Sequence, residues 1–187
     1  MVGRDRAMSS PYQTWVGSTV HRGVAVAIEQ RLDPLDLDAV FGHARATINK
    51  HPFGSRRAHI VVASRIRLYL RAFLPPEPWQ LRCAEMPVGR GRVDLCWVLA
   101  ERLSDRLPAG LLLFDEIKVS SLAWVLKDPA VRAQATRYEN DGDVDLGDRL
   151  LGTRIVALDM PAGAVLTARL QAWAPELPWL TGRSDLL

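Results

Sequence analysis

The sequence predicts an α/β domain in which an N-terminal helical segment precedes a mixed β-sheet flanked by helices. Three observations lead to this prediction. Apolar residues recur at helical spacing in the first third of the chain, the spacing becomes that of strands near residue 79, and helix and strand patterns then alternate. With 187 residues, of which 48% are hydrophobic, the chain is long enough for one domain with a real core.

Three helices are expected before the sheet. Residues 1–16 are polar and contain Pro11, so we expect a flexible N-terminal tail followed by a single domain over residues 17–187. Ser18 or Thr19 would cap the first helix, because a side-chain oxygen there can accept from the free N–H groups of the first turn. The expected helices span residues 17–32, 34–50 and 56–73.

The strand patterns begin with a hairpin. A two-residue Gly89–Arg90 turn would join its strands, because glycine adopts the positive φ that a tight turn requires. In that register Glu85 lies opposite Asp94 and Cys83 opposite Cys96, all on one face, and a slip of one residue would break the pairing. The expected elements from here on are strands at 79–88, 92–100 and 110–120, a helix at 129–140, a strand at 153–160, and a segment at 162–173 that fits either a strand or a short helix.

The stretch LLLFDEIKVS, residues 111–120, carries a buried apolar run directly into charged side chains. Strand side chains alternate between faces, so Glu116 and Lys118 would share one face and Asp115 would point to the other. If the hairpin lies beside this strand, Asp94 meets Glu116 and Lys118. The sequence therefore predicts two carboxylates and a lysine at one place on the sheet.

This constellation suits the hydrolysis of phosphodiesters. Hard divalent cations such as Mg²⁺ bind carboxylate oxygens, backbone carbonyls and phosphates, and a neighbouring lysine can orient a metal-bound water or help it lose a proton. An ordinary alternative is a solvated acid and lysine at the end of a strand, because so short a pattern often arises by chance.

Two further patterns extend the constellation. A G-x-x-x-H step runs from Gly17 to His21 on the first helix, and a Q-x-x-x-Y step places Gln134 and Tyr138 on one face of the helix that follows Lys118. In this order, G-x-x-x-H, Asp, E-x-K and Q-x-x-x-Y, the chain resembles the RecB-like branch of the PD-(D/E)XK nuclease superfamily. The resemblance covers residues 17 to 138, or to 158 with the last strand, and implies a restriction-endonuclease-like core.

The resemblance also implies roles for these residues. His21, Asp94, Glu116 and the Ile117 carbonyl would bind Mg²⁺ or Mn²⁺, and Lys118 would serve the attacking water, so that Asp94, Glu116 and Lys118 form the catalytic set. The side chains of Gln134 and Tyr138 would line the cleft, where they would hold either the nucleic-acid backbone or the lysine's surroundings.

Four other residues are added from their positions in the sequence. Arg90 lies in the hairpin turn and Arg92 shortly after it, both near Asp94, and both are expected to contact phosphates. Glu85 is a candidate through the hairpin register, and Glu29 because it follows His21 on the same helix.

Composition limits the class of protein. Cys83 and Cys96 are the only cysteines, so the chain lacks the four that hold an iron–sulfur cluster in some relatives. With no apolar signal segment and no run of about 18 apolar residues, we expect a cytoplasmic protein without a membrane partner. A net charge of +3 and a pI of about 9.2 permit a polyanionic partner without requiring one.

Together with the resemblance, the sequence thus predicts a metal-dependent deoxyribonuclease acting on single-stranded DNA or duplex ends, with a preference for exonuclease activity that leaves endonuclease activity open. A protein partner such as a helicase or a larger repair or defence complex is compatible with the resemblance. Two alternatives stay open. One is a catalytically silent subunit that binds nucleic acid or serves assembly, and the other is a metal-dependent hydrolase of small molecules on an unrelated α/β fold.

Overall fold

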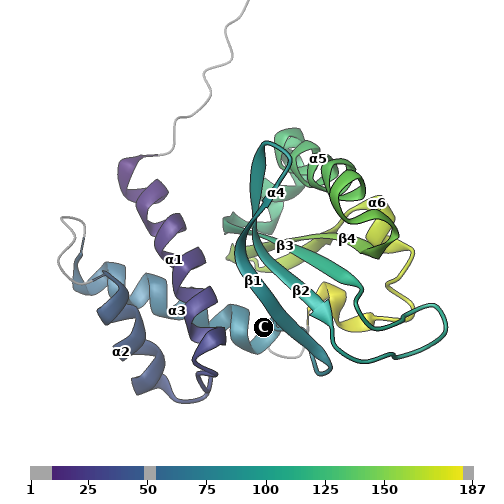
Figure 1. The fold of residues 1–187 in the computed structure, drawn as a ribbon. Helices are drawn as coiled ribbons and strands as arrows, with labels where there is room; N and C mark the ends of the chain where they lie inside the picture. Colours follow the sequence, from purple (N-terminus) through teal and green to yellow (C-terminus); the bar gives the residue numbers. More distant parts are fainter. Residues whose placement is uncertain (1–9, 49–53, 183–187) are drawn as a thin grey trace, which may run out of the picture.

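A five-stranded mixed sheet lies between two groups of helices (Figure 1). The structure is a computed structural model that describes residues 10–48 and 54–182. Its helices are α1 (Pro11–Glu29), α2 (Leu37–Ile48), α3 (Arg56–Ala72), α4 (Leu122–Lys127), α5 (Pro129–Leu146) and α6 (Ala168–Gln171), with 3₁₀ turns at Gly147–Arg149 and Pro178–Thr181. Its strands are β1 (Trp79–Val88), β2 (Gly91–Leu99), β3 (Leu112–Ser121), β4 (Leu150–Asp159) and β5 (Gly163–Leu166).

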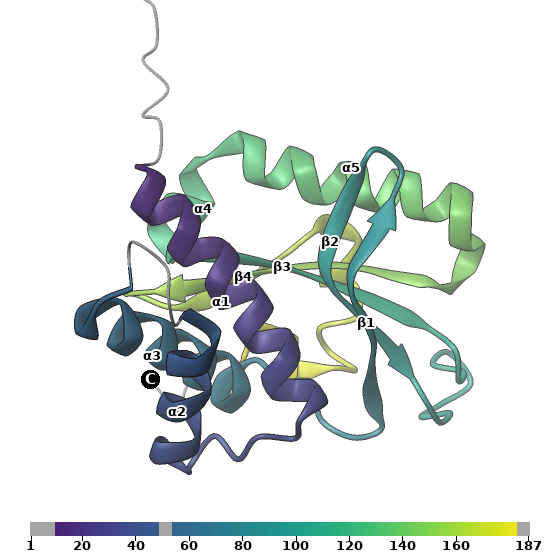
Figure 2. The ribbon, with the colours of Figure 1, turned by 60° about the vertical axis from the view of Figure 1, so that its left-hand side comes forward.

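The strands follow each other across the sheet in the order β1-β2-β3-β4-β5. The β3–β4 pair is parallel and the other three pairs are antiparallel. A parallel pair needs a long crossover between its strands, and α4 and α5 provide it on one face of the sheet (Figure 2). The predicted α/β class is confirmed: the fold is a mixed sheet flanked by helices, with an N-terminal helical segment.

The core is divided by the sheet. The larger apolar cluster packs α1 and α3 against side chains such as Leu95, Trp97 and Leu113, and two smaller clusters fill the space under α5 and α4. Ile117 and Phe114 are fully buried on opposite sides. Strand β3 is therefore covered on both faces, as its apolar run predicted.

The first helix begins earlier than the sequence predicted. Helix α1 starts at Pro11, behind a capping box in which the Ser10 hydroxyl accepts from the Gln13 backbone N–H and the Gln13 side chain accepts from the Ser10 N–H. Val16 is already buried. The expectation of a flexible tail up to residue 16 and of a cap at Ser18 or Thr19 was wrong, because Pro11 fits the first helical position instead of breaking the helix. Residues 1–9 lie outside the described residues.

The segment at 162–173 contains both predicted alternatives in turn, a short edge strand β5 and then α6. Helix α5 also continues to Leu146, beyond the predicted end at residue 140. No helix in the described part of the chain is both long enough and apolar enough to cross a membrane.

The hairpin register is confirmed. Val88 pairs with Gly91 across the two-residue Gly89–Arg90 turn, and Cys83 pairs with Cys96. Glu85 falls between the pairs Ala84↔Leu95 and Met86↔Val93, which sets it opposite Asp94.

The expectation that the four polar hairpin side chains share one face was wrong. Cys83 and Cys96 pack in the apolar cluster under α5, whereas Glu85 and Asp94 lie close to His21 of α1. The backbone at Glu85 explains part of this difference. Its φ of 52° is left-handed, and such a residue interrupts the regular alternation of side chains along a strand.

Candidate active site

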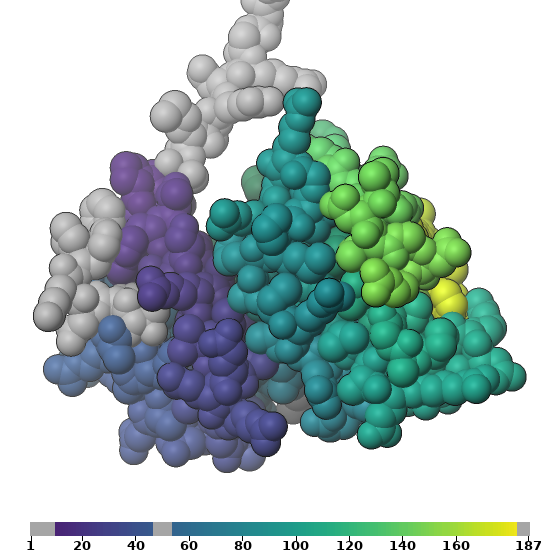
Figure 3. Space-filling model, in the orientation of Figure 1, coloured from purple at the N-terminus to yellow at the C-terminus, as the bar shows by residue number. Residues whose placement is uncertain are grey.

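The predicted site residues come from five elements that meet where α1 packs across β1 and β3. Figure 3 shows a hollow between α1 and the β1–β2 hairpin on the face that is drawn. The contributions are His21 from α1, Glu85 from β1, Asp94 from β2, Glu116, Ile117 and Lys118 from β3, and Gln134 and Tyr138 from α5.

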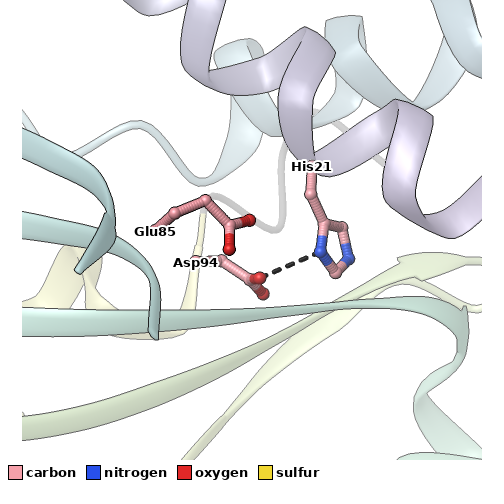
Figure 4. Close-up of side chains that lie close together, drawn as sticks. All are labelled: His21, Glu85 and Asp94. Atoms are coloured by element: carbon pink, nitrogen blue, oxygen red, sulfur yellow. Dashed lines mark ion pairs between the residues drawn. The ribbon is translucent and has the colours of Figure 1, made fainter. Parts of the chain in front are cut away.

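Three of these side chains form a tight group (Figure 4). One ligand atom from each of His21, Glu85 and Asp94 lies within 4.8 Å of the other two. His21 Nδ1 is 2.9 Å from Asp94 Oδ1. Burial alone would lower the pKa of His21, but the hydrogen bond to Asp94 and the charges of Asp94 and Glu116 raise it above its ordinary value. The group is rich in negative charge and suits a cation.

Asp94 lies where strands β2 and β3 separate. Their pairing ends at Leu95↔Asp115, and the next free N–H on β3, that of Ile117, donates to Asp94 Oδ2 at 2.6 Å. In a strand, the N–H and C=O of one residue point to the same neighbouring strand. The Ile117 carbonyl is therefore directed to the side on which Asp94 lies, as a metal-ligand role would require.

Glu116 is 4% exposed and has two unlike oxygens. Its Oε1 accepts from Lys118 Nζ at 2.7 Å and from Gln134 Nε2 at 2.9 Å. Its Oε2 is buried, and none of the described residues donates a hydrogen bond to it. Burial, followed by the charge of Asp94, raises the pKa of Glu116 to about 7, although Lys118 and His21 act in the opposite direction.

A divalent cation fits this arrangement. An unpartnered buried carboxylate oxygen is unfavourable, and so is a second carboxylate nearby without a cation between them. Carboxylates, a backbone carbonyl and one imidazole are a donor set for Mg²⁺ or Mn²⁺ more than for a thiol-seeking metal.

Gln134 and Tyr138 belong to a chain of hydrogen bonds that starts at the Lys118 ammonium. Lys118 Nζ donates to Gln134 Oε1 at 2.9 Å, and Gln134 Nε2 donates to the Tyr138 hydroxyl at 2.9 Å. That hydroxyl donates in turn to the carbonyl of Arg92 at 2.8 Å. Gly91 allows the approach, because a Cβ there would lie 2.7 Å from Tyr138 Cε1. Of the two roles predicted for this pair, the geometry favours the one near Lys118.

One polar network at this strand was missed from the sequence. Asp115 and Arg154 are both fully buried, with Arg154 Nε 2.8 Å from Asp115 Oδ1 and Nη2 2.6 Å from Oδ2. The Tyr69 hydroxyl and Trp97 Nε1 also donate to Asp115 Oδ2, and Arg154 Nη2 donates to the Phe73 carbonyl. Burial and the Asp115 charge raise the pKa of Tyr69 well above its usual range. The available signal was the lone arginine in TRIVALDM, since a buried aspartate needs such a partner.

The remaining predicted side chains form no described contact with this centre. Arg90 and Arg92 are exposed at the end of the hairpin. The prediction for Glu29 was wrong, because it lies two turns beyond His21, roughly 12 Å along the helix axis. Glu29 is exposed and lines a different cavity, of about 740 Å³, between the ends of α1 and α3 and the start of β1.

Comparison with known proteins gives little more. No protein-family model and no curated protein matches this chain significantly. Among solved structures, the chain is similar to the crystal structure of a repair endonuclease from Pyrococcus abyssi, with a TM-score of 0.31 and 17% sequence identity. The match covers 54% of this chain and 35% of that chain, so it spans about a third of that protein. At this level of similarity, any function must be argued from the side chains of this chain.

Proposed function

We propose that this protein is a divalent-metal-dependent nuclease that hydrolyses phosphodiester bonds in DNA. The observation that carries the proposal is the junction of β2 and β3. There Asp94 lies close enough to Glu116 for its charge to raise the pKa of Glu116, and Glu116 Oε2 is buried without a partner among the described residues. Lys118 lies beside the same carboxylate. A cation-binding pair of acids next to a held lysine suits the attack of water on a phosphate.

The metal would be held by Asp94, Glu116 and the Ile117 carbonyl. His21 of α1 and Glu85 of β1 would lie on the side of the metal that faces away from β3. When bound, Mg²⁺ or Mn²⁺ lowers the pKa of a coordinated water and screens the charge that develops on an attacked phosphate. His21 has to be neutral to act as a ligand, so protonation of His21 and binding of a cation would compete.

Lys118 is the residue we assign to the water and the phosphate. Its ammonium has three donors, and two of them are used by Glu116 Oε1 and Gln134 Oε1. The third can donate to the attacking water or to a phosphate oxygen. In the reaction a P–O bond forms from water, the P–O bond to the leaving sugar oxygen breaks, and the proton lost by water ends on that oxygen or in solvent.

The choice of DNA, the exonuclease preference and a protein partner such as a helicase come from the family resemblance and belong to the same proposal. The exposed arginines at the hairpin end support a polyanionic substrate. A strand end entering the hollow beside the hairpin would bring its last phosphates to Asp94.

The test is cleavage of end-labelled linear DNA and of closed circular DNA with Mg²⁺, Mn²⁺ or EDTA. We expect metal-dependent degradation of the linear form, sparing of closed circles, and a loss of at least about 100-fold in Asp94→Ala and Lys118→Ala, since each removes a group that acts in the transition state. Glu29→Ala is the matched control and should cleave like the unaltered protein.

The opposite outcome is equally informative. If DNA binds but no metal supports cleavage, the protein is a binding or assembly subunit with this fold. If DNA neither binds nor is cleaved, while a small phosphodiester is hydrolysed, the small-molecule alternative holds.

A further inference from the structure

Helix α1 contains two glycines, Gly17 and Gly23, although glycine destabilises a helix interior relative to alanine. A Cβ at Gly23 would lie 2.7 Å from Ile66 Cδ1, so the close packing of α1 on α3 accounts for that glycine. A Cβ at Gly17 would meet no such neighbour within 4 Å. The packing of the described residues therefore gives no reason for a glycine at position 17.

The position of Gly17 gives a reason that packing does not. Open space alone is not decisive, because Gly42 of α2 has it too, but Gly42 is exposed and Gly17 is half-buried. Gly17 lies four residues before His21, one turn away on the same helix face. The space over Gly17 thus adjoins the group of His21, Glu85 and Asp94, in the hollow between α1 and the hairpin (Figure 3).

The charges along α1 distinguish its two ends. Ahead of Glu29 the helix has no acidic residue, and Arg22, beside His21, is exposed. At the other end Glu29 and Glu77 offset Arg31 and Arg71 in the wall of the separate cavity. Carboxylates repel phosphates, whereas the exposed arginines of the hairpin end attract them. Charge therefore favours a polyanion along the N-terminal half of α1.

We propose that a DNA strand lies along the N-terminal half of α1 on its way to the metal site, and that its sugar–phosphate backbone approaches the helix most closely at Gly17. Glycine permits this approach because no side chain stands between the helix backbone and the strand. The strand would run between α1 and the hairpin end. The inference rests on the proposed function and adds the path of the substrate and a residue that controls it.

The test fills the space with Gly17→Leu, a large side chain that suits a helix and cannot donate to a phosphate. DNA affinity is measured by fluorescence anisotropy with Ca²⁺ in place of Mg²⁺, and Mn²⁺ affinity by calorimetry. We expect DNA affinity to fall by at least about tenfold, because the added side chain clashes with the strand. Mn²⁺ affinity should stay the same, since His21 is unaltered.

Two further variants control the test. Gly17→Ala adds only one methyl group and should weaken DNA binding less than Gly17→Leu. Gly42→Leu, the matched change in α2, should keep both affinities. A thermal melt shows that each variant is folded. In a cleavage assay KM of Gly17→Leu should rise about as much as its DNA affinity falls, with little change in kcat, because the side chain obstructs binding and not the reaction.

The outcomes separate the inference from the function it rests on. Unchanged DNA affinity in folded Gly17→Leu, or an equal loss in Gly42→Leu, would overturn the proposed path while metal-dependent cleavage stands. A parallel loss of Mn²⁺ affinity would overturn it too, since Gly17 would then act through His21. If the loss is confined to Gly17 variants but no metal supports cleavage, the path stands and the nuclease proposal fails. If the unaltered protein binds no DNA, both fail.

Discussion

Gln134 is the residue on which the geometry of the lysine depends. Its amide oxygen accepts from Lys118, and its amide nitrogen donates both to Glu116 Oε1 and to the Tyr138 hydroxyl. Lysine has a flexible four-carbon stem, so two acceptors that fix its ammonium restrict where the third donor points. In the proposed reaction we therefore assign Gln134 a positioning role, since it contacts Lys118 and Glu116 and acts through them.

Replacement of Gln134 by leucine should therefore lower kcat by roughly 10- to 100-fold, the range found when residues that orient an active group are removed. KM and the number of bound Mn²⁺ should change little, because the metal ligands stay in place. Steady-state kinetics on a labelled oligonucleotide and a Mn²⁺ titration measure the two quantities. Gln171→Leu, which changes an exposed glutamine on α6, is the control. If Gln134→Leu loses bound Mn²⁺ as strongly as it loses kcat, Gln134 belongs to the metal site instead.

Among single residues, the sequence predicts best those side chains whose direction follows from their spacing along a strand. The E-x-K step fixed which face Glu116 and Lys118 share, because strand alternation is rigid over three residues. The place of Glu85 depended on a left-handed backbone at one residue, which no local pattern predicts for a glutamate. The error at Glu29 came from treating position on a helix as proximity, although eight residues separate it from His21.

Among the elements, strands β3 and β4 form the rigid support of the site. Their parallel register places Asp115 next to Arg154, and the pair is sealed from water between α3 and the C-terminal segment, with the Arg154 guanidinium also over the Trp179 ring. Glu116 and Lys118 emerge from the opposite face of the same strand. Fixing Asp115 thus fixes the direction of Glu116 and Lys118, the side chains that we propose to be catalytic.

Arg154→Ala should destabilise the fold by about 3–5 kcal/mol, because it leaves the Asp115 carboxylate buried without its charge partner. Urea denaturation followed by circular dichroism gives the change in unfolding free energy. Arg102→Ala removes an exposed pair with Asp105 and should change it by less than about 1 kcal/mol. Equal losses in the two variants would show that Arg154 is not a special support.

The elements themselves were predictable where one pattern dominated. Helix α3, the β1–β2 hairpin and the buried strand β3 agree with the sequence to within a few residues. The start of α1 was missed because Pro11 signals both a break and a first helical turn, and only the Ser10–Gln13 capping box decides between them. The parallel pairing of β3 with β4 depends on a crossover that sequence periodicity cannot orient.

On the scale of the whole molecule, the site lies at the boundary between the N-terminal helices and the sheet, with the hairpin end beside it (Figures 1 and 3). Arg90 and Arg92 are exposed on this hairpin, while Arg102 and Arg106 lie in the loop at the other end of β2. The net charge of +3 is small. On the proposed function, the distribution of arginines is therefore expected to decide where DNA binds.

An Arg90→Ala, Arg92→Ala double variant should bind DNA more weakly and with a flatter dependence on salt. If each arginine contacts one phosphate, the slope of log affinity against log salt should fall in magnitude by about 1 to 2. Fluorescence anisotropy between 50 and 200 mM salt, with Ca²⁺ in place of Mg²⁺, measures it. The matched double alanine variant at Arg102 and Arg106 should keep the original slope; the same flattening there would mean that DNA contact is diffuse.

Because the backbone at Glu85 is left-handed, the residue type at this position reports which property of the protein has been selected. A non-glycine residue in that conformation costs roughly 1–2 kcal/mol, and the carboxylate adds repulsion from Asp94, so Glu85→Gly would relieve both. Selection for stability alone would therefore replace this glutamate, and selection for cation binding would keep it. A lineage that had abandoned the chemistry would drift to glycine or asparagine here long before its core changed.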